Sequence, residues 1–203
     1  MTPTAERAPG SGILQRALRP VGWFWRSPAR IVGLVVAVVL SQWALFRADA
    51  VFEGIAGVPT LDTQNDLDAA TATAQIDAYS GQAVAAYELF LFIDFFFPLL
   101  AALLLSGVVF GALTAANRRT RWTVPVWLAL ACLLPALFDY AENVGWAGAV
   151  ASSAGPGWIA AGLIAKGLKL AALGLAGVLV AASLVYLLVV VLATWRRSRS
   201  ASR

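Results

Sequence analysis

The fold is decided by residues 158–194, which read WIAAGLIAKGLKLAALGLAGVLVAASLVYLLVVVLAT. After Lys169 this stretch carries no charged side chain until Arg196, just beyond its end. About 20 consecutive apolar residues are enough for a helix to cross the hydrocarbon core of a bilayer. Residues 158–194 are therefore predicted to form a transmembrane helix.

Three more apolar stretches precede it, and each is long enough to span a membrane. The predicted spans cover about 28–47, 87–116, 122–150 and 158–194. We therefore expect an all-α polytopic membrane protein with a bundle of four transmembrane helices. Proline within or at the end of a span is expected to kink the helix, because it removes a backbone hydrogen bond. Such prolines are Pro98, Pro125 and Pro135.

The composition excludes several classes of protein. Hydrophobic residues make up 60% of the chain and charged residues only 13%, whereas soluble domains have about 25% charged residues. An ordinary soluble enzyme, a disordered protein and a nucleic-acid binder are thus excluded. The chain has no histidine and a single cysteine, Cys132. Histidine-ligated metals, Ser-His and Cys-His catalytic pairs and an intrachain disulfide are ruled out, and we expect no cofactor and no metal.

The basic residues predict the orientation. Most of the 15 Lys and Arg residues lie in 1–30, 118–121 and 196–203, which four spans place on one side. Because cytoplasmic segments are enriched in Lys and Arg, both termini are predicted to be cytoplasmic in a multi-pass protein of the inner (plasma) membrane. Tryptophan, which favours the membrane interfaces, fits this topology. Trp23, Trp25, Trp122, Trp127 and Trp195 fall at predicted inner ends, and Trp43, Trp146 and Trp158 at outer ends.

The segments outside the spans differ in character. Residues 1–27 form a basic N-terminal segment, in which an apolar stripe over 13–21 favours an interfacial helix, with a disordered leader as the alternative. The transmembrane domain covers 28–195 and the basic tail covers 196–203. A structureless outer loop as long as 47–86 is uncommon, and Asp66 followed by Leu67-Asp68 is typical of a capped helix start. We expect a short helix in this loop, followed by a break at Ser80-Gly81.

A cluster of six polar side chains lies within the predicted spans, all in their outer halves. Ionisable residues inside spans are costly and are candidates for a functional site. They are Asp94 in the second span, Asp139, Glu142 and Asn143 in the third, and Lys166 and Lys169 in the fourth. The spacings i, i+3 and i+4 place those of the third span on one face, and the two lysines share another. We expect all six to meet at one depth.

Two interpretations of this cluster remain open. It could be a polar pocket open to the outside, in which the carboxylates bind a cation, a proton or a polar head group. Alternatively, the lysines could reach the outer interface and pair with the carboxylates, which would only lock the helices together.

An ordered set of motifs extends the cluster. Leu61-Asp62-Thr63, Tyr87, Asp94-x-x-x-Pro98 and Asp139-x-x-Glu142-Asn143 occur in this order. The pattern resembles uncharacterised small bacterial four-span integral membrane proteins with an LDT … DxxxP … DxxEN layout. The resemblance implies a common bundle in which Asp62 and Tyr87 join the cluster, and it implies no activity.

Three functions follow from these features. The first is a structural or accessory membrane protein whose polar cluster holds the fold or a partner contact. The second is a protein that binds or carries a lipid, a small molecule or a cation with Asp94, Asp139 and Glu142. The third is an intramembrane acid/base enzyme on a lipid substrate, although no catalytic residue can be assigned. Expected partners are the lipid bilayer, a bound lipid, and a second copy or another membrane subunit, but no nucleic acid.

Overall fold

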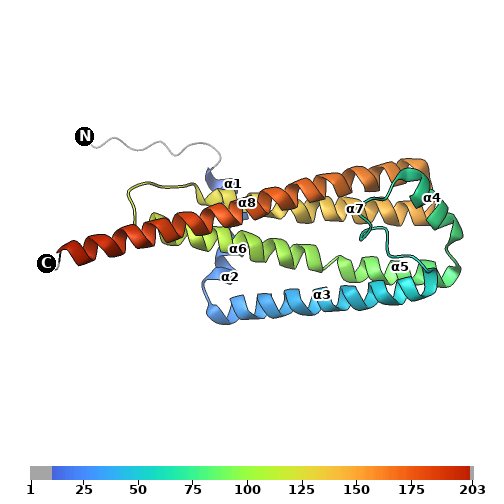
Figure 1. Cartoon of the computed structure of the whole chain (residues 1–203), viewed down its shortest axis with the longest axis horizontal. Helices are drawn as coiled ribbons and strands as arrows, with labels where there is room; N and C mark the ends of the chain where they lie inside the picture. The colour runs from blue at the N-terminus through green and yellow to red at the C-terminus, as the bar shows by residue number, and fades with distance from the viewer. Residues whose placement is uncertain (1–10, 202–203) are drawn as a thin grey trace.

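The computed structural model describes residues 11–201, and over this range the chain is all-helical (Figure 1). The predicted bundle of four transmembrane helices is confirmed, because four helical segments are long and apolar enough to cross a membrane. Arg7 and Arg203, which contributed to the predicted orientation, lie outside the described residues. The first span is α3 (Pro28–Ala56), the second α5 (Gly81–Asp94) with α6 (Phe97–Asn117), the third η1 (Val126–Leu133) with α7 (Leu134–Ala151), and the fourth α8 (Pro156–Ala201).

The first span is longer than predicted, and the outer loop is correspondingly shorter. Helix α3 continues past residue 47 to Ala56, and α5 already begins at Gly81. The extension forms because Ala48 and Phe52, one helical turn apart, are buried in the core. Gly57 then ends α3 in a left-handed conformation (φ 73°), which glycine adopts without strain. The loop therefore covers 57–80 rather than 47–86.

The predicted helix in this loop is present as α4 (Ala69–Ala78). Its N-cap is Asp68 rather than Asp66, and the Asp68 carboxylate accepts a hydrogen bond from the Thr71 N–H at 2.7 Å. The same N–H lowers the pKa of Asp68 below its ordinary value. Ser80 caps the start of α5 in the same way, accepting from the Ala83 N–H at 3.2 Å. Helix α4 lies at the end of the bundle opposite the C-terminus and packs on α8 (Figure 1).

Two of the spans are interrupted inside the membrane, as the prolines suggest. The second span breaks between α5 and α6 just before Pro98, and the third changes from η1 to α7 just before Pro135. Such breaks free backbone carbonyls that find no water in the bilayer, so they need other donors. The Tyr140 hydroxyl donates to the Phe95 carbonyl at 2.9 Å, and the Ser106 hydroxyl donates to the Ala129 carbonyl at 2.8 Å.

The N-terminal segment contains two short helices instead of one interfacial helix. They are α1 (Ser11–Ala17) and α2 (Arg19–Trp25). Ile13 on α1 is largely exposed, which fits an interfacial position, whereas Val21 on α2 is buried. Helix α2 packs on α6, where the Trp25 ring lies against Gly107 and Gly111. A Cβ atom at either glycine would overlap this ring.

The four spans do not pack equally. Helices α7 and α8, which a short turn joins, form the most extensive pair among the described elements. Helix α3 packs chiefly on α5 and α6, whereas α8 packs chiefly on α7 and α6. This arrangement leaves α3 and α8 on either side of a cleft.

Candidate functional site

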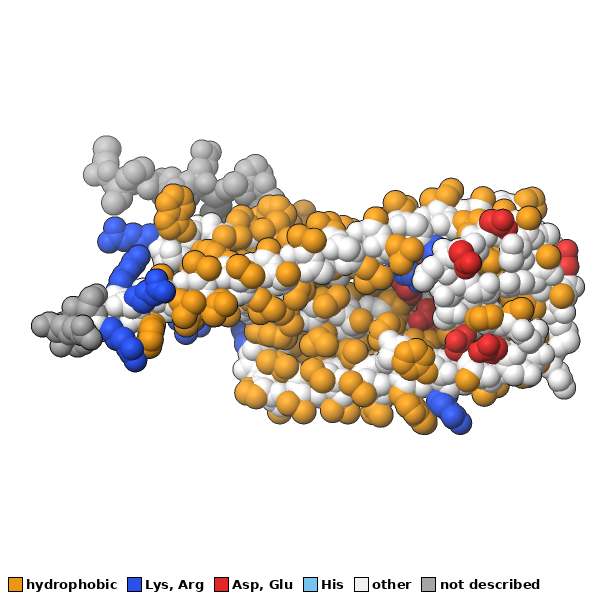
Figure 2. Space-filling model, in the orientation of Figure 1, with side chains coloured by type: hydrophobic (Ala, Val, Ile, Leu, Met, Phe, Trp, Pro, Cys, Tyr) orange, Lys and Arg blue, Asp and Glu red, His pale blue; other side chains and the backbone are white. Residues whose placement is uncertain are grey.

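The cleft between α3 and α8 is a cavity of about 250 Å³. Figure 2 shows it as a hollow in the side of the molecule, with acidic side chains at its back. All four spans and the loop at 57–80 contribute to its wall. Because the hollow lies in the side of the bundle, it opens toward the lipid and not only toward the end of the molecule.

The cleft has a polar part and an apolar part. Its polar lining includes Asp49, Asp62, Asp94, Asp139 and Lys169. Its apolar lining includes Leu45, Phe46, Phe97, Ala101, Leu105 and Leu173. Helix α6 runs from Pro98 toward the basic end of the molecule, so the apolar lining of α6 continues deeper into the membrane than Asp94. The cleft thus matches an amphipathic group with a polar head and an apolar tail.

Lys169 connects α8 to α7 in the wall of the cleft. Its Nζ lies 2.9 Å from Asp139 Oδ1 and forms a second ion pair with Glu142 Oε2. Glu142 is fully buried, and its Oε1 accepts a hydrogen bond from Trp146 Nε1 at 3.1 Å. Residues 139, 142 and 146 follow one another at i, i+3 and i+7, so they share one face of α7.

Asp94 is held at the helix break. It is the last residue of α5 and is 6% exposed, and its Oδ2 accepts a hydrogen bond from Asn143 Nδ2 at 2.8 Å. Asn143 lies one residue beyond Glu142 on α7. The Asp94–Asn143 contact therefore joins the second span to the third at the depth of the Lys169 ion pairs.

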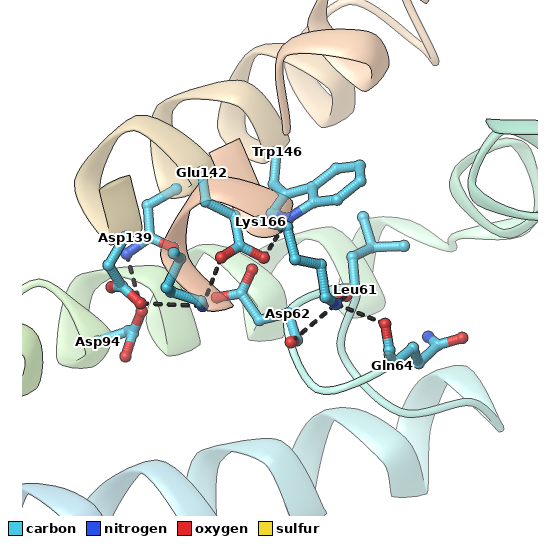
Figure 3. Close-up of polar contacts among 10 residues, drawn as sticks. Leu61, Asp62, Gln64, Asp94, Asp139, Glu142, Trp146 and Lys166 are labelled. Carbon is cyan, nitrogen blue, oxygen red and sulfur yellow. Dashed lines mark hydrogen bonds and ion pairs between the residues drawn. The ribbon is translucent and has the colours of Figure 1, made fainter. Parts of the chain in front are cut away.

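Lys166 anchors the loop at 57–80 beside the cleft. Its Nζ donates to the backbone carbonyls of Leu61, Asp62 and Gln64 at 2.8, 3.0 and 2.5 Å (Figure 3). These three bonds satisfy all donors of a buried ammonium group. They also place the Asp62 side chain against the cluster on α7. Burial, and secondly the neighbouring Glu142, raise the pKa of Asp62 well above its ordinary value.

Two carboxylate oxygens that belong to the wall of the cleft have no partner. Asp62 Oδ1 and Asp139 Oδ2 are buried and accept no hydrogen bond from any described residue. A buried acceptor without a donor costs about 1–3 kcal/mol, and more if it is charged. The cluster therefore keeps two buried acceptor oxygens without a donor beside the cleft.

The predicted site residues occupy four different positions. Asp62, Asp94, Asp139 and Lys169 line the cleft, whereas Glu142 and Asn143 stand behind them and orient Lys169 and Asp94. Lys166 points to the loop. Tyr87 does not line the cleft and packs in an aromatic group with Phe52 and Phe90, at ring-centroid distances of 5.3 and 6.1 Å.

Sequence reasoning missed Asp49, because the first span was predicted to end before it. Asp49 follows Gln42 by two helical turns, and both line the cleft. Its Oδ1 accepts bonds from the Thr60 hydroxyl at 2.8 Å and the Thr60 N–H at 3.2 Å. Trp146, which was predicted at an end of the third span for its preference for the interface, is fully buried, and its Nε1 donates to Glu142 Oε1. Its spacing of four residues from Glu142 is the signal that could have revealed the contact.

The lining of the cleft is acidic, with four aspartates and Lys169. No group of three or more Asp, Glu or Cys side chains within residues 11–201 has the geometry to hold a metal ion. The unpartnered oxygens suit a group that brings its own N–H or O–H donors.

Comparison with known proteins finds no family model, no curated protein and no solved structure that matches this chain. The resemblance to small bacterial four-span proteins thus stays an expectation, and functional inference rests on the geometry of the cleft.

Proposed function

We propose that the protein binds an amphipathic ligand with an ammonium head group, which enters the cleft from the bilayer between α3 and α8. The head group would lie among the carboxylates, and the tail along the apolar lining of α6 and α8. A site of this kind could serve a lipid-binding protein or a carrier. The observation that carries the proposal is the lining of this laterally open cavity, which brings four aspartates together with Lys169.

The charge balance of the cleft supports a cationic ligand. Four aspartates line it, and Lys169 is its one lysine or arginine among the described residues. Lys169 is already shared between Asp139 and Glu142. A buried carboxylate without a positive partner must be protonated or must acquire one. A primary ammonium group supplies both a charge and three N–H donors.

We expect Asp62→Asn to weaken binding of dodecylammonium about 10–100-fold, because a hydrogen bond to a charged group contributes about 1.5–3 kcal/mol. Binding is measured with the full chain in phosphatidylcholine nanodiscs. The matched control is Asp66→Asn, which removes the same charge from an exposed position of the same loop. Equal affinity of wild type and Asp62→Asn would contradict the proposal, as would equal losses in both variants.

The affinity should also rise with pH. The raised pKa of Asp62 keeps its carboxyl protonated at low pH, and only the ionised form attracts an ammonium group. Asp62 faces Glu142, Lys169, Asp94 and Asp139, so the whole cluster contributes to this titration. The dependence on pH should be reduced in Asp62→Asn.

A structural or accessory role is the second candidate. Lys166 ties the loop to α8, and Lys169 ties α8 to α7. Together the two lysines join the loop at 57–80, α8 and α7 without any ligand. We call this set of contacts the interlock; it could stabilise the fold or a surface that a membrane partner contacts. This role would be favoured if wild type bound no dodecylammonium and a double-mutant cycle showed energetic coupling between Lys169 and Glu142.

We further propose that both termini lie in the cytoplasm and that the membrane is the inner (plasma) membrane. The basic residues gather at the end of the molecule where α8 ends, and the acidic residues at the opposite end (Figure 2). This separation supports the positive-inside assignment.

Cysteine labelling tests the orientation. In a Cys132→Ala background, Asp66→Cys should react with a membrane-impermeant maleimide in intact cells. Thr120→Cys, in the loop at the opposite end, should react only after the cells are opened. The reverse pattern would overturn the proposed orientation.

A further inference from the structure

The end of the molecule opposite the cleft carries a second cavity, of about 550 Å³. Its lining belongs to the turn after α6 and to the end of α8. The lining residues are Arg118, Arg119, Thr120, Arg121, Trp122 and Arg197. Four of the six lining residues are arginines, and none of the six is acidic.

The turn that carries these arginines is held in place at both ends. Asn117 Nδ2 donates to the Val124 carbonyl at 2.8 Å, and the Val124 N–H donates back to Asn117 Oδ1 at 3.0 Å. Tyr186 on α8 donates its hydroxyl to the Trp122 carbonyl at 3.1 Å. These bonds fix the arginine-bearing turn against α8, so the basic cavity is a built feature of the fold.

An apolar groove of about 220 Å³ adjoins the basic cavity. The two share the same turn, and the Tyr186–Trp122 hydrogen bond joins their walls. The groove is lined by Val109, Leu113, Val124, Leu128, Leu179, Ala182, Ser183 and Tyr186. Along α8, Leu179 and Arg197 are separated by about 27 Å at about 1.5 Å per residue, so the groove extends from the basic end toward the interior of the bilayer.

Exposed tryptophans mark this level as the membrane interface. Trp122 is 82% exposed, Trp195 is 50% exposed and Trp127 is 48% exposed. Indole rings favour the head-group region, where one end of the ring is apolar and the other meets water. The basic cavity thus lies at the level of lipid phosphates, and the groove lies at the level of acyl chains.

We propose that this cavity and groove together bind one anionic phospholipid, with the phosphate among the arginines and an acyl chain along α6 and α8. One guanidinium group can donate two parallel hydrogen bonds to two oxygens of the same phosphate, which favours arginine at such a site. The adjoining groove is the reason to assign a lipid rather than free phosphate. The site is separate from the acidic cleft and does not depend on its ligand.

Native mass spectrometry of the full chain in detergent, titrated with phosphatidylglycerol, tests this inference. The triple variant Arg118→Gln/Arg119→Gln/Arg121→Gln should bind about 100-fold more weakly, given the contribution of each basic residue near an anionic lipid. The matched control is Arg16→Gln/Arg19→Gln/Arg26→Gln, which removes the same charge from the N-terminal helices and should bind like wild type. Equal losses in the two triple variants would overturn the site.

A second pair of variants tests the groove. Ala182→Phe should fill it and lower the number of retained lipids, whereas Ala181→Phe, at an exposed position outside the groove, should not. Competition distinguishes the source of the phosphate: glycerol phosphate should fail to displace the lipid at equal concentration. Displacement by glycerol phosphate, or equal retention by both phenylalanine variants, would overturn the assignment of a lipid.

Discussion

Replacing Lys169 with Met should destabilise the protein by about 3–5 kcal/mol. The substitution leaves Asp139 and Glu142 without their cation, and Glu142 is fully buried. Breaking one side of a buried ion pair has this cost because a charge remains in a medium that does not solvate it. The free energy of unfolding in mixed detergent micelles measures the loss.

A double-mutant cycle separates the ion pair from other effects of the substitution. Glu142→Gln alone should cost less stability. Lys169 would keep its ion pair with Asp139, and the glutamine side-chain oxygen could still accept the hydrogen bond from Trp146 Nε1. Lys169→Met with Glu142→Gln should recover part of the stability lost in Lys169→Met. Glu88→Gln, on an exposed face of α5, provides the uncoupled control. A coupling energy of zero between Lys169 and Glu142 would refute the interlock.

Replacing Gly145 with Ala should destabilise the bundle by about 3 kcal/mol, the upper range for overpacking a core. A Cβ atom at Gly145 would lie 2.6 Å from the backbone nitrogen of Gly162 and 2.7 Å from its Cα. Both are backbone atoms of α8, so no side-chain rotation can relieve the overlap. Helices α7 and α8 would have to separate, and Lys169 would move away from Asp139. Thermal unfolding measures the effect.

Gly174→Ala is the matched control for this prediction. Gly174 is also a glycine within a spanning helix, but a Cβ atom there would meet nothing within 4 Å. Alanine is a better helix former than glycine by about 1 kcal/mol, so this variant should be as stable as wild type or more so. Equal effects of the two substitutions would show that the close approach of α7 and α8 is not required.

The membrane-spanning architecture could be predicted from the sequence because it depends on local properties. In a bilayer the backbone must satisfy its own hydrogen bonds, so an apolar stretch of sufficient length becomes a helix whatever its neighbours are. Residues 158–194 therefore indicated α8 directly. The end of the first span could not be predicted in this way. Ala48 and Phe52 extend α3 because they are buried against other elements, which the local run of apolar residues does not reveal.

The candidate site also has a part that the sequence predicts and a part that only the tertiary structure decides. Helical periodicity and depth determined by themselves that Asp94, Asp139 and Lys169 would lie at one level of the membrane. Only the tertiary structure decided that Lys169 contacts Asp139 while Lys166 holds the loop, because that choice depends on how α8 is rotated and how closely it approaches α7 at Gly145. It also decided that α3 and α8 stand apart around an acidic cleft. Periodicity specifies the face and height of each side chain, whereas the partner of each face follows from packing between helices.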